Sequence, residues 1–232
     1  MKSITLLAID TSTEACSAAL MCQGRVEERY RFAARTHTQL ILPMMQSLLE
    51  EASLKLNDLD ALAFTRGPGS FTGIRLAASI IQASAFSADL PVVLVSSLHC
   101  LAQGAYREKQ AKQVFAAIDA HLQEVFFASY RLNPETSLMQ ASGSEQLGLP
   151  QEAHTDLTDF VGVGSGWDRY HALFKKQFNN RLQQWYPQRY PRAYDAAILA
   201  THAYHQGETV TAGEALPTYL RETVAQQRGF DG

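Results

Sequence analysis

The amino-acid sequence predicts a duplicated α/β fold in which each half begins with an apolar strand that ends in aspartate. Two observations carry this prediction. The tripeptide Ala-Ile-Asp occurs at residues 8–10 and again at residues 117–119, each time at the end of an apolar run. Each copy precedes a short turn with a glutamate, Glu14 or Glu124, and then a second strand-like run. A repeat of this size indicates gene duplication; the alternative is two unrelated strands that both end in aspartate.

The first half alternates strand and helix patterns in the order βββαβαβα. Apolar runs bounded by turn residues predict strands, and apolar residues three and four positions apart predict helices. We expect strands at residues 4–10, 16–20, 27–32, 59–65 and 91–95, and helices at residues 38–52, 72–87 and 97–106.

A charged stretch at residues 107–112 separates the halves, so we expect an N-terminal domain at residues 1–107 and a smaller, degenerate C-terminal domain at residues 108–232. The second half repeats the opening strands and then becomes less regular. We expect strands at residues 114–119, 124–130 and 160–164, helices at residues 168–178 and 194–205, loop at 133–151, an extended segment at 216–221 and a frayed end at 226–232.

Composition narrows the classes of function. With a net charge of −3, the chain lacks the basic surface that a protein needs to hold nucleic acid alone. No apolar run approaches the ~18–20 residues of a membrane span. The N-terminus also lacks a secretory signal, so we expect a cytoplasmic protein without a membrane partner. Three scattered cysteines, Cys16, Cys22 and Cys100, predict reduced thiols.

The first strand end is a candidate ligand site, because α/β folds bind ligands at the carboxyl ends of their strands. In actin-like kinases and ATPases, an aspartate at this place helps to hold Mg²⁺ and the next turn binds phosphate. Asp10, Thr11 and Ser12 fit that pattern. A structural role, in which Asp10 caps its own turn, is an equal alternative. For Asp119 we favour the structural role, since the residues after it include neither glycine nor a hydroxyl.

A glycine-rich loop follows the fourth predicted strand. Ser70 or Thr72 would cap the next helix, and its free N–H groups could receive an anion. The loop lacks the lysine of a P-loop, so a rigid turn is an alternative of at least equal weight to a phosphate cradle. Asp10, Thr11, Ser12, Gly67, Gly69 and Ser70 are therefore candidates for a vestigial nucleotide site, with ATP and Mg²⁺ as weak expectations.

The sequence gives little support to metal binding or to catalysis. His37 opens the first predicted helix, but Ile41 stands four residues later, where a second metal ligand would lie. His202 and His205 have no acidic or cysteine partner nearby in the sequence. We therefore predict no metal site and no catalytic residues.

The helix at residues 72–87 is apolar on nearly all sides and carries one charge, Arg75. Such a helix must be buried all round, whereas a two-layer domain leaves one helix face in solvent. We therefore expect a partner subunit to cover it and the helix before it. The alternative is a central helix enclosed by its own chain. The predicted interface residues are Leu40, Ile41, Met44, Met45, Leu48, Ile74, Ala77, Ala78, Ile81 and Ala85.

Several stretches resemble the TsaB (YeaZ) family of bacteria. They are residues 8–17, the motif His37-Thr38-Gln39-x-Ile41-Leu42-Pro43 and residues 67–75, the most specific of the three. Residues 96–98, Asp119 and the late motif Pro217-x-Tyr219-Leu220-Arg221-x-x-Val224-Ala225 are also similar. The resemblance runs from residue 3 to about residue 225.

The resemblance implies an actin-like (ASKHA, ribonuclease H-like) duplicated fold with a reduced second domain. It also implies a non-catalytic, activating subunit of the complex that transfers threonylcarbamoyl from threonylcarbamoyl-AMP to the adenosine next to the anticodon of tRNAs that read A-starting codons. The implied partners are a TsaD-like catalytic subunit in a heterodimer, a TsaE-like ATPase, a second copy in a homodimer, and tRNA through the complex. TsaD binds metal through a His-x-x-x-His helix, and Ile41 breaks that pair here.

Two alternatives stand beside this hypothesis. A stand-alone ATP-binding kinase or ATPase of the same fold would use Asp10, Thr11 and Ser12 together with the glycine pattern at residues 162–166. A metallopeptidase would need bound metal and would depend on His37.

Overall fold

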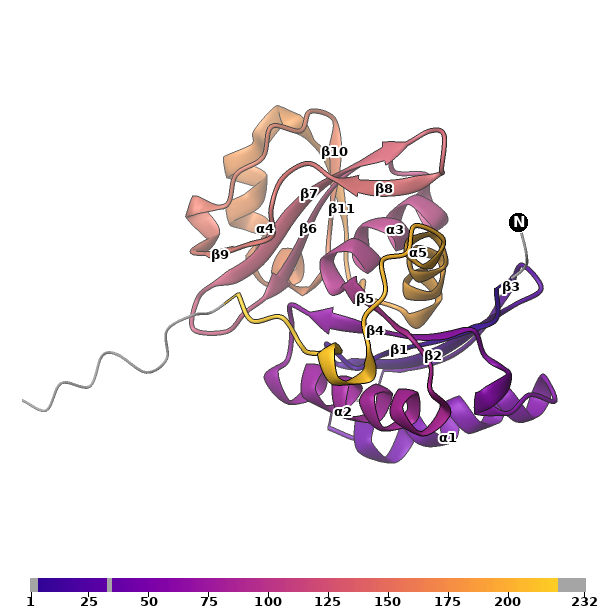
Figure 1. Cartoon of the computed structure of the whole chain (residues 1–232). Coiled ribbons are helices and arrows are strands. Elements are labelled where there is room, and N and C mark those ends of the chain that lie inside the picture. The colour runs from indigo at the N-terminus through magenta and orange to yellow at the C-terminus, as the bar shows by residue number, and fades with distance from the viewer. Residues whose placement is uncertain (1–3, 33–34, 221–232) are drawn as a thin grey trace, which may run out of the picture.

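The computed structural model describes residues 4–32 and 35–220. Over these residues the chain forms two mixed β-sheets with helices packed on them, and Figure 1 shows the two sheets as separate lobes joined along one side. The opening strand of each half lies inside its sheet and ends at one of the repeated aspartates. The duplicated α/β arrangement that the sequence predicts is confirmed.

The first sheet has the strand order β3-β2-β1-β4-β5. Its strands are β1 (Leu6–Asp10), β2 (Ala15–Cys22), β3 (Arg25–Phe32), β4 (Ala61–Gly67) and β5 (Val92–Ser96). The first three form an antiparallel meander, and β4 and β5 run parallel to β1. Every residue of β1 is buried, which explains its uninterrupted apolar sequence. The edge strand β3 carries charged residues that discourage pairing with another chain.

Two helices, α1 (His37–Glu51) and α2 (Phe71–Ala88), cover the lower face of the first sheet in Figure 1. Side chains such as Ile41, Leu48 and Ile81 enter a common core with Leu7 and Ile9 of β1. The helices therefore bury one side against their own sheet and leave the other side outward.

The second sheet has the order β11-β10-β6-β7-β8, and β9 also pairs with β7. Its strands are β6 (Gln113–Asp119), β7 (Val125–Asn133), β8 (Leu138–Ala141), β9 (Gln146–Gly148), β10 (Phe160–Val163) and β11 (Leu182–Tyr186). Helix α4 (Ser165–Phe178) covers one face through a core of aromatic rings that includes Phe115, Trp167 and Phe174. Short 3-10 turns lie at Leu56–Asp58 (η1), Pro150–Glu152 (η2), Asn179–Arg181 (η3) and Ala212–Glu214 (η4).

The remaining two helices each pack on the sheet of the other half. Helix α3 (Ser97–Lys109) shares a core with β6 and β7, whereas α5 (Ala193–His205) shares a core with β1, β4 and β5. The two helices contact each other between the lobes (Figure 1). Gly104 permits this contact, because a Cβ there would lie 2.9 Å from Oδ2 of Asp195. A division of the chain after residue 107 would thus leave α5 apart from the sheet that it covers.

The predicted elements agree with the structure to within a few residues, with informative differences. Strands β8, β9 and β11 are absent from the prediction because they are short and partly exposed. Helix α3 continues to Lys109, so the charged break begins only at Gln110. Residues 216–220 form no strand. Arg221 and the predicted frayed end at residues 226–232 lie outside the described residues.

Candidate functional site

The turn after β1 is closed. Asp10, Thr11 and Ser12 are all fully buried. Oδ1 of Asp10 accepts hydrogen bonds from Oγ of Ser12 at 2.6 Å and from the Ser12 amide at 3.3 Å, and it also accepts one from Oγ1 of Thr65. Its Oδ2 has no hydrogen-bond partner among the described residues. Because burial disfavours the charged form, the pKa of Asp10 is raised to about 6.

The glycine-rich loop lies directly on this turn. The Ser70 amide donates to the carbonyl oxygen of Ser12 at 2.7 Å, and Oγ1 of Thr11 donates to the carbonyl oxygen of Gly73 at 2.7 Å. A Cβ on Gly69 would lie 2.2 Å from the Ser12 carbonyl oxygen, so glycine is required for backbone to meet backbone. Ser70 caps α2 by accepting a hydrogen bond from the Gly73 amide at 3.3 Å, which confirms one of the two predicted caps.

The structure brings the candidate nucleotide residues together and, apart from Oδ2 of Asp10, pairs the hydrogen-bonding groups described above with one another or with neighbouring residues. The carboxylate of Asp10 lies beneath the turn, and the amide of Ser70 already has an acceptor. These residues do not fit Mg²⁺ and a phosphate. For Asp10, the structural alternative therefore accounts for the contacts that the side chain makes.

A cleft of about 1110 Å³ opens beyond the closed turn, between the two halves of the chain. Ser12, Gly69 and Ser70 line one wall, and the turn after β6 lines the other. Phe71 and Leu122 project from the two walls with exposed fractions of 60% and 79%. The cleft surface thus combines backbone from the closed turn with exposed apolar side chains.

The second strand end has a different chemistry. Oδ1 of Asp119 accepts from the amide of His121 at 3.2 Å, and Oδ2 accepts from Nη1 of Arg169 at 2.9 Å. Its own amide donates to Oγ of Ser165 at 3.1 Å. Asp119 caps its turn and pairs with a surface arginine, in agreement with the structural role that its neighbours in the sequence predict.

The predicted interface residues require a correction. Nine of the ten are buried in the core of their own domain, and Leu40 is half-buried. Side chains that fill a core offer little surface to a partner. The error arose because Ala and Ile on nearly every side of α2 conceal which side faces the sheet. The nine predicted interface residues that lie in the core instead are Ile41, Met44, Met45, Leu48, Ile74, Ala77, Ala78, Ile81 and Ala85.

The outward side of the same two helices is nevertheless apolar. Phe86 and Leu42 have exposed fractions of 85% and 53%. Leu76 and Ile80 are half-buried on α2, and Ala83 is exposed. We call Leu42, Leu76, Ile80, Ala83 and Phe86 the outer helix face. Sequence periodicity did not separate these residues from the core because α2 lacks a polar stripe.

The segment at residues 216–220 returns to the start of α2. The Thr218 amide donates to the carbonyl oxygen of Arg66 at 2.9 Å. Oη of Tyr219 accepts from Nε of Arg75 at 2.8 Å, and the Arg75 guanidinium stacks 3.3 Å from the Phe71 ring centroid. The late motif and the glycine-rich loop, far apart in the sequence, are thus in contact. Arg221, Val224 and Ala225 of that motif lie outside the described residues.

The described residues offer no metal centre. Over residues 4–32 and 35–220, no three His, Cys, Asp or Glu side chains gather in a way that could hold a metal ion. Nε2 of His37 lies 3.1 Å from the carbonyl oxygen of Ala15.

No helix in the described part of the chain has the length and apolar character to cross a bilayer. The cysteines are free thiols, and Cys16 and Cys100 are buried.

Comparisons with known proteins agree with this architecture. A family model described as TsaD, tRNA N6-adenosine threonylcarbamoyltransferase, matches residues 30–228. The tRNA threonylcarbamoyladenosine biosynthesis protein TsaB of Haemophilus influenzae is 41% identical, with 98% of each chain covered. The TsaB protein of Escherichia coli is 39% identical over 96% of this chain and 97% of that protein.

A solved structure matches as well. YeaZ from Pseudomonas aeruginosa superposes with a TM-score of 0.87 at 43% identity, covering 94% of this chain and 100% of that one. The full-length relatives therefore carry the TsaB name, and the sheets have the duplicated actin-like arrangement. The chain belongs to the TsaB (YeaZ) family.

Proposed function

We propose that this protein is the non-catalytic, activating subunit of a complex that transfers threonylcarbamoyl to the adenosine next to the anticodon of tRNAs reading A-starting codons. The observation that carries the proposal is a contrast within the first half. The turn that would bind nucleotide in an actin-like enzyme is closed by its own chain, whereas the outer helix face exposes apolar side chains.

The outer helix face is the proposed contact with a TsaD-like catalytic subunit. Exposed apolar side chains on the outward side of two helices that cover the same sheet are typical of protein interfaces. In the absence of that subunit, the same face would pair with a second copy, giving a homodimer. A TsaE-like ATPase would join the complex, which would act in the cytoplasm.

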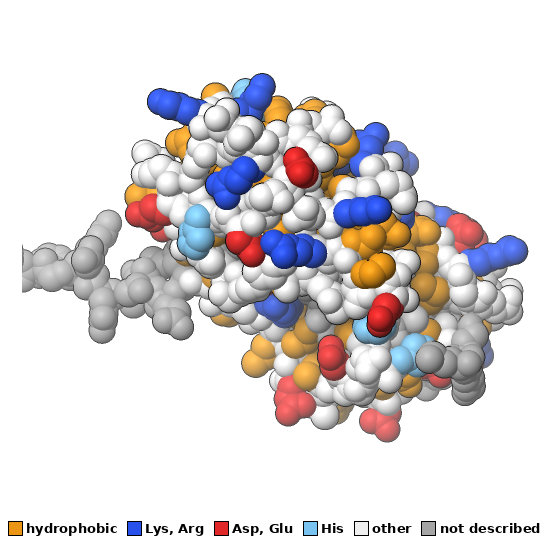
Figure 2. Space-filling model, turned by 90° about the horizontal axis from the view of Figure 1, so that it is seen from above, with side chains coloured by type: hydrophobic (Ala, Val, Ile, Leu, Met, Phe, Trp, Pro, Cys, Tyr) orange, Lys and Arg blue, Asp and Glu red, His pale blue; other side chains and the backbone are white. Residues whose placement is uncertain are grey.

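The charge of the chain supports an indirect role toward tRNA. Figure 2 shows Lys and Arg side chains scattered over one face, with acidic and uncharged groups between them. With a net charge of −3, the chain offers little of the phosphate neutralisation on which RNA affinity depends. The proposed role therefore leaves most of the tRNA contact to the partner subunit.

Reconstitution tests the proposal. The purified chain is combined with the TsaD and TsaE proteins of the same genome, their tRNA and threonylcarbamoyl-AMP, and tRNA modification is measured. We expect modification to need this chain. The double variant Ile80→Asp, Phe86→Asp should lower both complex formation and modification at least about tenfold, because two carboxylates would be buried in an apolar contact.

The control is Leu149→Asp, which places one carboxylate at an exposed leucine of the second half. Thermal unfolding of each isolated variant separates lost binding from lost folding. Ala78→Asp and Ile81→Asp are unsuitable, since both side chains lie in the core. Native complex formation and modification by the folded double variant would refute the assigned surface. Modification without this chain would refute the function.

A further inference from the structure

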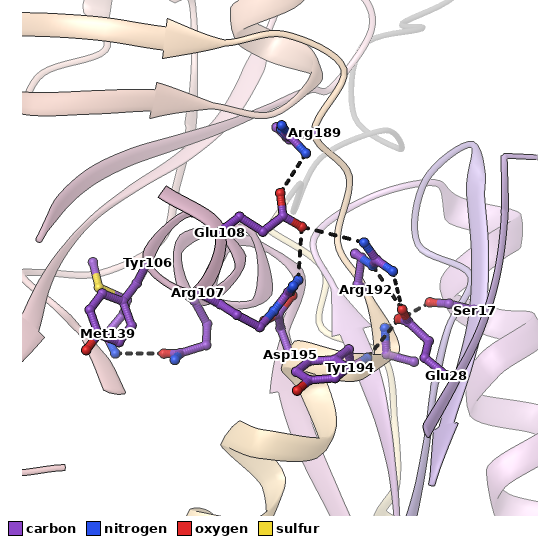
Figure 3. A network of polar contacts seen from close by, with 12 residues as sticks. Ser17, Glu28, Tyr106, Arg107, Glu108, Met139, Arg189, Arg192, Tyr194 and Asp195 are labelled. Atoms are coloured by element: carbon purple, nitrogen blue, oxygen red, sulfur yellow. Dashed lines mark hydrogen bonds and ion pairs between the residues drawn. The ribbon is translucent and has the colours of Figure 1, made fainter. Parts of the chain in front are cut away.

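A second, smaller pocket of about 170 Å³ lies where the C-terminal end of α3 meets residues 186–192 and the edge strand β3; Figure 3 shows the polar network around it. Four cationic side chains line it: Arg107, Lys109, Arg189 and Arg192. Two carboxylates, Glu108 and Asp195, also belong to the lining. The pocket thus gathers positive charge in a chain that is negative overall.

The two carboxylates are already bound by arginines. Asp195 receives hydrogen bonds from Nε and Nη2 of Arg107 at 2.9 and 3.0 Å. Glu108 lies among three guanidinium groups, with Arg189 Nη1 at 2.6 Å, Arg107 Nη2 at 3.1 Å and Arg192 Nη1 at 3.5 Å. Glu28, outside the pocket, accepts from Nε of Arg192 at 3.0 Å. These three carboxylates face four cations, so one positive charge is unmatched.

The unmatched positive charge points to an anion. Nε of Arg189 is buried and has no hydrogen-bond partner among the described residues. Within the described ranges, no carboxylate lies within 4.0 Å of Nζ of Lys109. This ammonium group lies over the Tyr186 ring, 5.6 Å from the ring centroid. A buried N–H without an acceptor costs free energy, but this one is out of reach of water and so of a ligand oxygen. An oxyanion in the pocket would instead meet the Lys109 ammonium and the adjoining guanidinium groups in charge-assisted hydrogen bonds.

We propose that this pocket binds a single phosphate group. Its volume is well below the ~300–1,000 Å³ of sites for drug-sized ligands, which excludes a whole nucleotide inside it. Guanidinium groups favour phosphate through their planar arrangement of donors, and an ammonium adds a point charge. The phosphate comes either from free inorganic phosphate or from an RNA backbone. The site does not depend on the function proposed above.

The test is titration of the full chain with inorganic phosphate at constant ionic strength, followed by 31P NMR line broadening and by thermal unfolding. We expect saturable binding in the millimolar range. Lys109→Gln should weaken it about tenfold, the effect of losing one charge-assisted hydrogen bond. Lys109 is exposed and makes no ion pair in the described structure, so this variant should retain the native fold.

Lys175→Gln is the matched control, because it removes the same charge from an exposed position on α4. Absence of saturation at tens of millimolar phosphate, or equal losses in both variants, overturns the site. A single-stranded RNA oligonucleotide is then added to the phosphate-loaded chain. If the RNA displaces inorganic phosphate, the site binds an RNA phosphate; if it does not, the site binds the free anion. In either case the phosphate must have bound in the pocket first.

Discussion

The two repeated strand ends have the same three residues, but the turn after Asp10 is closed and the turn after Asp119 is open. In the first half, the loop before α2 rests on the turn that follows Asp10, so that Gly69 and Gly73 meet the carbonyl oxygens of Ser12 and Thr11. In the second half, the start of α4 rests on the strand itself, two residues before Asp119, where Gly164 and Gly166 meet Ala117. A shift of three to four residues in this contact, counted between equivalent positions of the repeat, closes one turn and leaves the other open.

The open turn shows what the absence of that contact permits. His121, Leu122 and Gln123 all have positive φ angles, of 59°, 48° and 64°. Leu122 extends into the cleft, while Arg169 reaches Asp119 from outside. The strand motif therefore sets the position of the aspartate, whereas the packing of the next loop decides whether that aspartate can meet a ligand.

The largest expected effect comes from breaking the closure itself. In Gly73→Ala the new Cβ would lie 2.0 Å from the backbone oxygen of Thr11, which must then move. Alanine favours a helix over glycine by about 1 kcal/mol, but the clash outweighs this, and we expect a loss of about 3 kcal/mol in the free energy of unfolding. Urea denaturation measures it.

Two further alanine variants sharpen that comparison. For Gly166→Ala the nearest atom is the Cβ of Ala117 at 2.9 Å, so a smaller loss is expected. Gly213→Ala has nothing within 4 Å of the new Cβ and should leave stability nearly unchanged. Equal losses at all three positions would contradict the difference drawn between the two loops.

The next expected effect is a gain in stability. Asp10 holds its proton up to a pKa of about 6 in the folded state, compared with a pKa of 3.8 for an unperturbed aspartate, as in the unfolded chain. Between these values the folded state binds more protons, so its stability falls as pH rises, and the loss is complete above about pH 6. Asp10→Asn removes the buried charge and keeps an acceptor for Ser12 and Thr65, so it should stabilise the protein at pH 7 by about 2 kcal/mol.

The control for this effect is Asp119→Asn, at the equivalent strand end. It loses the pairing with Arg169 and should destabilise slightly. Thermal unfolding between pH 4 and pH 8 distinguishes the two. The pKa of Asp195 is likewise raised to about 6 by burial, so part of the pH dependence should persist in Asp10→Asn. A destabilised Asp10→Asn at pH 7 would contradict the assigned buried charge.

The smallest effect concerns the open turn. Leucine is disfavoured at positive φ, whereas asparagine tolerates it. Leu122→Asn should therefore raise the free energy of unfolding by about 0.5 kcal/mol, since the exposed leucine loses little packing. Thr13→Asn, in the closed turn where no positive φ occurs among residues 11–14, should give no gain. A gain at Thr13 equal to that at Leu122 would remove the backbone explanation.

Local sequence determined the order of the principal strands and helices, the duplication marked by Asp10 and Asp119, and a helix cap at Ser70 or Thr72; the structure selects Ser70. These features depend on period, turn residues and side-chain-to-backbone bonds within a few positions, which a sequence displays directly. It also determined the family, because residues 67–75 combine glycines and a cap in a specific order.

Tertiary structure alone decided which side of α2 is core, since Ala77, Ala78 and Ile81 differ little in character from Ile80 and Ala83 on its other side. It also decided the exchange of α3 and α5 between the sheets, in which Gly104 lies against Asp195. Tertiary structure also decided the closure of the turn after Asp10. Backbone contacts between segments about 60 residues apart, such as the Ser70 amide with the Ser12 carbonyl oxygen, cannot be read from a local pattern. The sequence shows only the glycines, and the partners that require them lie far away in the chain.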